Sequence, residues 1–391
     1  MKYIAILLVL GLLLSGCAAA PAQSPTSEPT APPTIAPTET APAADTDVEA
    51  FAPTEAPSMP ELLLFQMTTE EKVGQLFFVR CQKETAVQDL ETYQFGGYVL
   101  FGADFEDETP DSIRKTLSAY QEASTTPLLI AVDEEGGTVT RVSRYAAFRE
   151  SPFPAPRWLY AEGGLEAVLQ AEAEKSGFLR DLGINVNLAP VCDITTDEDA
   201  FMYDRSLGQD PQTTADVISA MVTVMTANQM GSVLKHFPGY GNNTDTHTAM
   251  AADSRSLEEL ETADLLPFAA GIDAGCGAIL VGHTIVEALD PEMPATLSEK
   301  VHQYLREEMS FDGVIITDDL YMQAITDAYG AEEAAILAVL AGNDLLCCRE
   351  YEIQYPAVLE AVQSGRISQE ILDSAVLRIL RWKEALGLLA G

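Results

Sequence analysis

The chain is poor in basic residues. Of its 391 residues only 22 are Lys or Arg, against 60 Asp and Glu, which gives a formal net charge of -38. A surface of this kind repels nucleic-acid phosphates and anionic lipid headgroups, so we expect no nucleic-acid partner. The hydrophobic fraction of 47% is nevertheless that of a folded protein rather than of a disordered acidic chain.

Cysteine is also scarce, with six residues in the chain. One of them, Cys17, belongs to the N-terminal signal described below, and the five that remain do not suggest a disulfide framework. Most of the five lie in or beside apolar runs, where a small buried hydrophobic residue is the expected role. Adjacent Cys347 and Cys348 would point to opposite faces of a strand, so we expect no bond between them.

The N-terminus has the pattern of a secretory signal. Lys2 precedes an apolar run at 4–14, which is too short to span a bilayer comfortably, and small residues lead to Cys17. The tetrapeptide 14–17 resembles the lipobox of bacterial lipoproteins, in which the Cys carries a diacylglyceryl group. We therefore expect a signal peptide at 1–16 and a lipid anchor on Cys17, which would hold the protein at the extracytoplasmic side of a bacterial cell membrane.

Residues 17–60 are expected to form a linker. They hold ten of the 22 prolines and no Lys or Arg, and such a segment cannot build a core. Pro-rich chain favours an extended conformation, so this linker could act as a spacer on the order of 100 Å. The folded domain would then occupy residues 61–391.

That domain alternates short apolar runs with longer helical patterns, which is typical of βα units. Eight runs are predicted to be strands: 75–80, 97–101, 128–132, 186–190, 232–236, 278–281, 313–317 and 344–347. The predicted helices are 110–123, 165–182, 213–228, 256–274, 298–308, 331–341 and 367–388, the fourth of which begins with a capping box at Ser256. Eight strands predict an α/β fold of one (β/α)8 barrel, which leaves no sequence for a second catalytic domain.

Polar residues follow these apolar runs, at the strand ends where a barrel of this type carries its chemistry. They are Asp133, Asp193, Lys235, His236, His283, Asp318 and Asp319. Because the carboxyl ends of the strands meet at one rim, we expect most of these side chains to line a cleft.

Three segments around these positions carry a family resemblance: 132–141, 235–247 and 314–320. Their order and spacing resemble glycoside hydrolase family 3, and in particular its β-N-acetylhexosaminidase branch, over residues 62–388. The chain departs from the branch at Tyr240, where His is usual, at Thr246, where Ser is usual, and at 250–252, where the branch has Leu-Pro. All three departures fall on one loop, which bears on the preferred leaving group.

The resemblance implies a role for each matching residue. Asp318 would be the nucleophile and His247 the acid/base group, with Asp245 as its partner; Asp133, Arg141, Arg205, Lys235 and His236 would bind the sugar. The chemistry fits, since hydrolysis with retention needs a carboxylate nucleophile and an acid/base group, and histidine titrates near neutral pH. We interpret Asp193 and His283 as supports of the rim, and structural salt bridges remain the alternative role for the sugar-binding residues.

The function expected from the resemblance is a retaining, exo-acting β-N-acetylhexosaminidase that removes terminal GlcNAc from glycans or peptidoglycan fragments. A β-glucosidase or a glycoside phosphorylase of the same family is the alternative enzyme. A sugar-binding lipoprotein without turnover is disfavoured by the presence of Asp318, Asp245 and His247. We expect no cofactor, because no Gly-Lys-Ser/Thr follows the glycines at 239 and 241, and no metal, because His, Cys and Asp lack ligand spacing.

Overall fold

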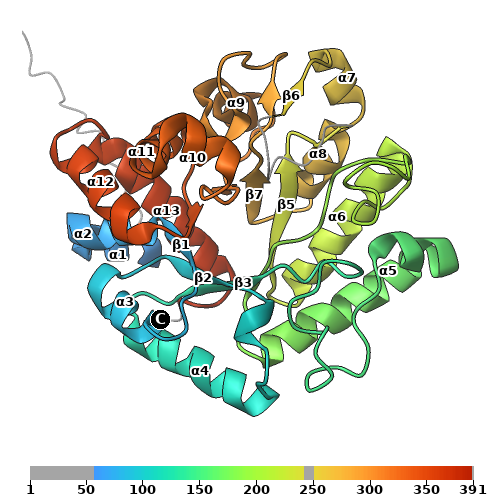
Figure 1. Cartoon of the computed structure of the whole chain (residues 1–391), viewed down its shortest axis with the longest axis horizontal. Helices are drawn as coiled ribbons and strands as arrows, with labels where there is room; N and C mark the ends of the chain where they lie inside the picture. The colour runs from blue at the N-terminus through green and yellow to red at the C-terminus, as the bar shows by residue number, and fades with distance from the viewer. Residues whose placement is uncertain (1–56, 242–250, 390–391) are drawn as a thin grey trace, which may run out of the picture. The chain divides into compact units, whose positions relative to one another are not determined.

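The computed structural model describes residues 57–241 and 251–389, and these fold around a ring of parallel strands (Figure 1). The strands lie in chain order around the ring, and a parallel bridge between Ile316 and Leu345 joins the last strand to the one before it. They are β1 Phe77–Arg80, β2 Gly97–Leu100, β3 Leu129–Val132, β4 Val186–Asn187, β5 Gly231–Phe237, β7 Ala278–Val281, β9 Val314–Thr317 and β10 Leu346–Cys348. The predicted (β/α)8 barrel is confirmed.

Helices surround the strands and cover the outside of the ring (Figure 1). They are α1 Met59–Gln66, α2 Thr69–Gln75, α3 Ala86–Tyr93, α4 Pro110–Ala123, α5 Pro156–Asp181, α6 Pro211–Ala227, α7 Leu257–Thr262, α8 Leu265–Asp273, α9 Glu299–Gln303, α10 Gln323–Tyr329, α11 Ala331–Ala341, α12 Tyr351–Gln363 and α13 Gln369–Ala385. Shorter segments are the helical turns η1 Gly102–Asp104, η2 Ala295–Leu297 and η3 Tyr304–Glu308, and a small ladder of β6 Ala252–Asp253 with β8 Ile285–Val286.

All eight predicted strands exist, with bounds that differ from the prediction by a few residues at most. The largest difference is at β4, which was predicted to reach Pro190 and ends at Asn187. The chain turns there, since the Ala189 N–H donates to the Asn187 carbonyl at 2.7 Å and Pro190 has no N–H to offer a neighbouring strand.

The predicted helices 110–123 and 331–341 are α4 and α11, and 213–228 and 367–388 agree with α6 and α13 within three residues at each end. The predicted helix 165–182 is the later part of α5, which begins nine residues earlier, and two further predictions are wrong in part. The predicted helix 256–274 is two helices, α7 and α8, because the backbone at Ala263 leaves the helical region (φ -132°, ψ -84°). The predicted helix 298–308 likewise divides into α9 and the π turn η3. The capping box at Ser256 is confirmed, since the Glu259 N–H donates to Ser256 Oγ at 3.3 Å and the Ser256 N–H donates to the Glu259 carboxylate at 2.7 Å.

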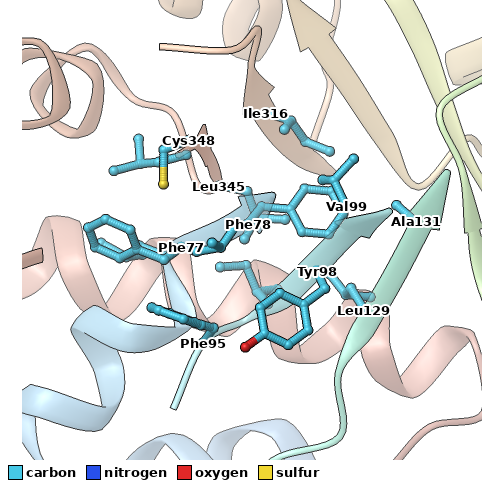
Figure 2. Packing of buried hydrophobic residues seen from close by; sticks show 14 of the residues in the cluster. Phe77, Phe78, Phe95, Tyr98, Val99, Leu129, Ala131, Ile316, Leu345 and Cys348 are labelled. Atoms are coloured by element: carbon cyan, nitrogen blue, oxygen red, sulfur yellow. The ribbon is translucent and has the colours of Figure 1, made fainter. Parts of the chain in front are cut away.

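The core lies on both faces of the strands, because parallel strands in this fold are covered inside and outside. Phe77 of β1 packs outward against Tyr355 of α12, with ring centroids 5.7 Å apart. The next residue, Phe78, points to the opposite face, toward Val99 of β2 (Figure 2). This packing fixes the strands, and with them the residues that follow their carboxyl ends.

The cysteines of the described region are free, and Cys347 and Cys348 are not bonded to each other, as predicted. Four of the five are buried, and Cys347 is half-buried. No helix within 57–241 or 251–389 is long and apolar enough to cross a membrane.

Candidate active site

A cavity of about 560 Å³ opens at the carboxyl ends of the strands. Six of the residues predicted for the site line it: Asp133, Arg141, Arg205, Lys235, His236 and Asp318. They come from the ends of β3, β5 and β9 and from the loops after β3 and β4. The structure therefore brings these six together, whereas Asp245, His247 and Cys17 lie outside the described residues.

Asp133 contacts two of the basic side chains that were predicted for the site. Its Oδ1 lies 2.7 Å from Lys235 Nζ, and its Oδ2 lies 3.4 Å from an Nη atom of Arg141. Lys235 is almost completely buried, with 2% of its side chain exposed, so the carboxylate offsets a charge that has lost most of its water. The shorter of the two contacts fixes the ammonium group at the cavity.

Glu135 is a further member of this cluster, and the sequence pattern did not predict it. Its carboxylate lies 2.6 Å from Lys235 Nζ and accepts two hydrogen bonds from Arg205, at 3.0 and 2.8 Å. Burial raises the pKa of Glu135, but the charges of Lys235 and Arg205 outweigh burial and hold the pKa well below its usual range. Glu135 is therefore an ionised carboxylate. It positions Lys235 and Arg205, two of the residues predicted to bind the sugar.

Glu134 organises the backbone beside it. This fully buried carboxylate accepts hydrogen bonds from the N–H groups of Arg141 and Val142, both at 2.8 Å, and of Ser143 at 3.3 Å. The contacts pin the loop after β3 at the residue that carries the Arg141 guanidinium. The only sequence signal for Glu134 and Glu135 was their place directly after Asp133.

His236 is held between Asp193 and Arg205. Asp193 Oδ2 lies 2.8 Å from His236 Nδ1 and accepts the His236 N–H at 3.1 Å. An Arg205 Nη atom donates toward His236 Nε2 at 3.2 Å. Because arginine can only donate, the contacts fit the tautomer with its proton on Nδ1. Asp193 thus fixes the ring and the backbone of His236, which is the supporting role expected of it.

The carboxylate of Asp318 is oriented by backbone groups. The Asp318 N–H donates to the Val281 carbonyl at 3.0 Å, and Asp318 Oδ1 accepts the Asp319 N–H at 2.8 Å. Burial raises the pKa of the neighbouring Asp319, and the Asp318 charge adds to that rise. Asp319 therefore favours its protonated form more than an ordinary aspartate does.

His283 supports the same segment. Its Nε2 lies 3.1 Å from the Asp319 carbonyl oxygen and its Nδ1 lies 2.8 Å from Thr296 Oγ1. His283 is 1% exposed, so it does not face solvent, and it contacts the backbone of the residue that follows Asp318.

The arrangement suits a neutral ligand with many hydroxyl groups. Carboxylates accept from hydroxyls, while Lys and Arg donate, and bonds in which one partner is charged are the stronger ones. The Asp318 carboxylate, held at the rim of the same cavity, can attack an electrophilic carbon of a ligand bound there.

Comparisons with known proteins agree with this chemistry. Residues 68–382 match the family model described as "Glycosyl hydrolase family 3 N terminal domain". A beta-hexosaminidase from Xanthomonas campestris pv. campestris (strain B100) is 34% identical over 296 residues, covering 74% of this chain and 86% of that protein. A beta-hexosaminidase from Xylella fastidiosa (strain M23) is 35% identical over 307 residues, covering 77% of this chain and 89% of that protein.

A solved structure is also similar to this chain. It is a glycoside hydrolase family 3 beta-N-acetylglucosaminidase from Paenibacillus sp. str. FPU-7, with 33% identity and a TM-score of 0.78. The match covers 83% of this chain and 64% of that one, so this chain spans less than two thirds of the Paenibacillus structure.

Proposed function

The chain belongs to glycoside hydrolase family 3, and from this premise we propose that it is a retaining, exo-acting β-N-acetylhexosaminidase that releases terminal GlcNAc. The observation that carries the proposal is the placement of Asp318 in one cavity with the ion-paired groups Asp133, Lys235 and Arg205. The names of the relatives, beta-hexosaminidase and beta-N-acetylglucosaminidase, support the N-acetylated sugar.

In the proposed reaction an oxygen of Asp318 attacks the anomeric carbon and forms a glycosyl ester, while the bond from that carbon to the leaving oxygen breaks. The leaving oxygen takes a proton from His247. Water then attacks the same carbon, His247 accepts a proton from it, and the ester bond to Asp318 breaks. The two displacements at one carbon restore its configuration, and Asp245 would hold His247 in the required tautomer.

The sugar would be bound by the charged groups on the cavity wall. Asp133 can accept from hydroxyls, and Lys235, Arg141, Arg205 and His236 can contact the other ring substituents. The carboxylates of Asp133 and Glu135 keep the cations in place before the sugar arrives, so little reorganisation is needed on binding.

The same proposal extends to location. A signal peptide at 1–16, a lipid group on Cys17 and a linker to residue 60 would place the barrel outside a bacterial cell membrane, where peptidoglycan fragments are the foremost source of terminal GlcNAc. We expect mass spectrometry of the protein extracted from membranes to find Cys17 as the first residue with a diacylglyceryl group on its sulfur, and to find no such group in Cys17→Ala. A wild-type protein that begins at another residue, or whose Cys17 carries no lipid, would remove the lipid anchor from the proposal.

One panel of substrates tests the activity. Release of p-nitrophenol from the β-glycosides of GlcNAc, glucose and xylose is measured with and without phosphate. The proposal predicts the highest kcat/KM for GlcNAc and no dependence on phosphate. A preference for glucose would contradict the sugar assignment, and a phosphate-dependent rate with a sugar phosphate as product would make the protein a phosphorylase.

Asp318→Ala tests the nucleophile with the same panel. We expect turnover of every substrate to fall below about 1% of wild type, since covalent catalysis contributes far more than the two orders of magnitude that this limit represents. An unchanged unfolding transition is the control for folding, because Asp318 is not part of the core. Activity above that limit would assign the nucleophile to another residue.

A further inference from the structure

Two aromatic rings line the cavity within the described part of the chain, and they differ in their surroundings. Phe101 lies under the guanidinium groups of Arg80 and Arg141, which are 4.2 and 5.5 Å from the centre of its ring. Phe201, on the loop after β4, is among the exposed large hydrophobic residues of the protein, with 38% exposure. An aromatic ring that stays exposed beside the charged groups of this cavity needs an explanation.

Phe201 rests on a fixed support. Its ring centroid lies 5.5 Å from that of Tyr240, at an interplanar angle of 37°. Tyr240 is 4% exposed and packs with Val191 and Met202 in a small apolar cluster apart from the main core. The Tyr240 N–H also donates to Asp193 at 2.7 Å, so the support of Phe201 is tied to the carboxylate that holds His236.

The depth of the residues indicates which part of a substrate Phe201 meets. Lys235 and His236 are 2% and 8% exposed and lie at the bottom of the cavity, where a terminal sugar would be bound. Phe201 is far more exposed, so it lies nearer to solvent. In an exo-acting enzyme the leaving group extends from the bound terminal sugar toward solvent.

We propose that Phe201 is the platform of a subsite for the leaving group, on which the C–H face of a second hexopyranose ring stacks. The proposal rests on the proposed glycosidase function and deepens it, since it assigns a preference for leaving groups that are themselves sugars. Stacking that removes about 50 Å² of apolar surface from water changes affinity about tenfold.

The test compares Phe201→Ala with wild type on a disaccharide and on a glycoside without a second ring. The substrates are GlcNAc-β-1,4-GlcNAc and methyl β-GlcNAc. For the disaccharide we expect KM to rise about tenfold with little change in kcat, because stacking stabilises ground state and transition state alike. KM for the methyl glycoside and the inhibition constant of free GlcNAc should stay within about twofold of wild type. Phe201→Trp should restore the disaccharide KM.

Trp158→Ala is the matched control, since Trp158 is a more exposed aromatic residue, at 51%, that does not line the cavity. It should leave all constants at their wild-type values. An equal loss on the methyl glycoside would place Phe201 against the terminal sugar, and an unchanged disaccharide KM would remove the stacking role; either result overturns the subsite.

Failure of the proposed function has a different signature. If the wild-type protein cleaves glucosides and no GlcNAc substrate, the N-acetylhexosaminidase assignment fails. The subsite is then tested with the same variants on cellobiose and methyl β-glucoside, and the same selective rise in KM supports it.

Discussion

At the scale of single residues, the charged side chains at the cavity form a network of ion pairs. Lys235 contacts both Asp133 and Glu135, and Arg205 contacts both Glu135 and His236. Because nearly all of these groups are buried or half-buried, each charge depends on its partner for the solvation that water no longer supplies. The network therefore contributes to stability, and in the proposed function its members also bind the substrate.

Glu135→Gln tests that dependence. The change removes the negative charge between Lys235 and Arg205, and breaking a buried ion pair costs about 3–5 kcal/mol in the free energy of unfolding. The matched control is Glu174→Gln, which breaks a contact of 3.0 Å between Arg149 and a carboxylate that is 57% exposed, and which should cost less than about 1 kcal/mol. Urea unfolding measures both, and equal losses in the two variants would contradict the role of Glu135.

The acid/base pair is tested by the choice of leaving group. If His247 donates the proton and Asp245 orients it, His247→Ala and Asp245→Ala should each impair alkyl glycosides far more than p-nitrophenyl glycosides, because an activated phenol scarcely needs a proton to leave. The double variant should lose much less than the sum of the two single losses, since the pair acts as a unit. Additive losses, or equal losses on both kinds of substrate, would show that these residues are not the acid/base pair.

Asp133, Lys235, His236 and Asp318 could be placed at the cavity from the sequence because each follows an apolar run, at the end of a strand. Arg141 and Arg205 do not follow such runs and were predicted only from the family resemblance. Glu135 could not be predicted in the same way. Its partners Arg205 and Lys235 lie 70 and 100 positions further along the chain, so the pairing exists only once the barrel has closed. Glu134 was missed for a related reason, because its partners are backbone N–H groups that any residue type would supply.

At the scale of elements, the loop after β5 depends on close packing of its glycines. Gly239 has a φ of +122°, and a Cβ there would lie 2.6 Å from an oxygen of Asp264. Asp264 is itself buried and paired with Arg255 at 2.6 Å, so it has little room to move. The sequence pattern Gly239-x-Gly241 thus reflects both a backbone conformation and a tight contact.

Gly239→Ala should therefore destabilise the protein more than an alanine substitution at a glycine that has a positive φ but no close neighbour. Gly275 is the control, since it also has a positive φ, +85°, with nothing within 4 Å of an added Cβ. We expect Gly275→Ala to cost about 1 kcal/mol and Gly239→Ala to cost clearly more, with loss of glycosidase activity. Thermal unfolding and p-nitrophenyl-GlcNAc hydrolysis measure the two effects; equal costs would contradict the contact with Asp264.

The strands were easier to predict than the helices. A buried parallel strand is a continuous apolar run, which stands out from a chain with 60 acidic residues. Helix α12 was missed because Pro356 lies inside it, and proline ordinarily ends a helix. The helix 256–274 was predicted as one because its apolar period continues through Ala263, where only the tertiary structure reveals the break.

At the scale of the whole molecule, α2, near the start of the described region, packs against α13, its last helix. Lys383 of α13 is fully buried, and its Nζ donates to Gln75 Oε1 of α2 at 2.6 Å. Burial lowers the pKa of Lys383 to about 7 from its ordinary value of 10.5. A contact between distant ends of the sequence thus makes the stability of the whole fold sensitive to pH.

The direction of this pH dependence follows from the number of protons that Lys383 binds in the unfolded and in the folded chain. Between pH 7 and about 10.5 the unfolded chain binds a proton at Lys383 that the folded chain has released, so stability rises with pH by up to about 1.4 kcal/mol per unit from this group. Lys383→Met should be more stable than wild type at pH 7, and its advantage should shrink by about 2 kcal/mol by pH 9. Urea unfolding at both pH values measures the difference, and a constant difference would contradict the buried neutral lysine.

The proposed mechanism requires a covalent bond between Asp318 and the sugar, and mass spectrometry of a trapped intermediate detects that bond. The protein is incubated with a 5-fluoro GlcNAc glycosyl fluoride, which forms the glycosyl ester quickly and releases it slowly, and is then digested. We expect one added fluoro-GlcNAc on the peptide that contains residues 314–320, located at Asp318 and absent from Asp318→Ala. An adduct on Asp319, or no adduct on a protein that turns over the substrate, would show that Asp318 is not the nucleophile.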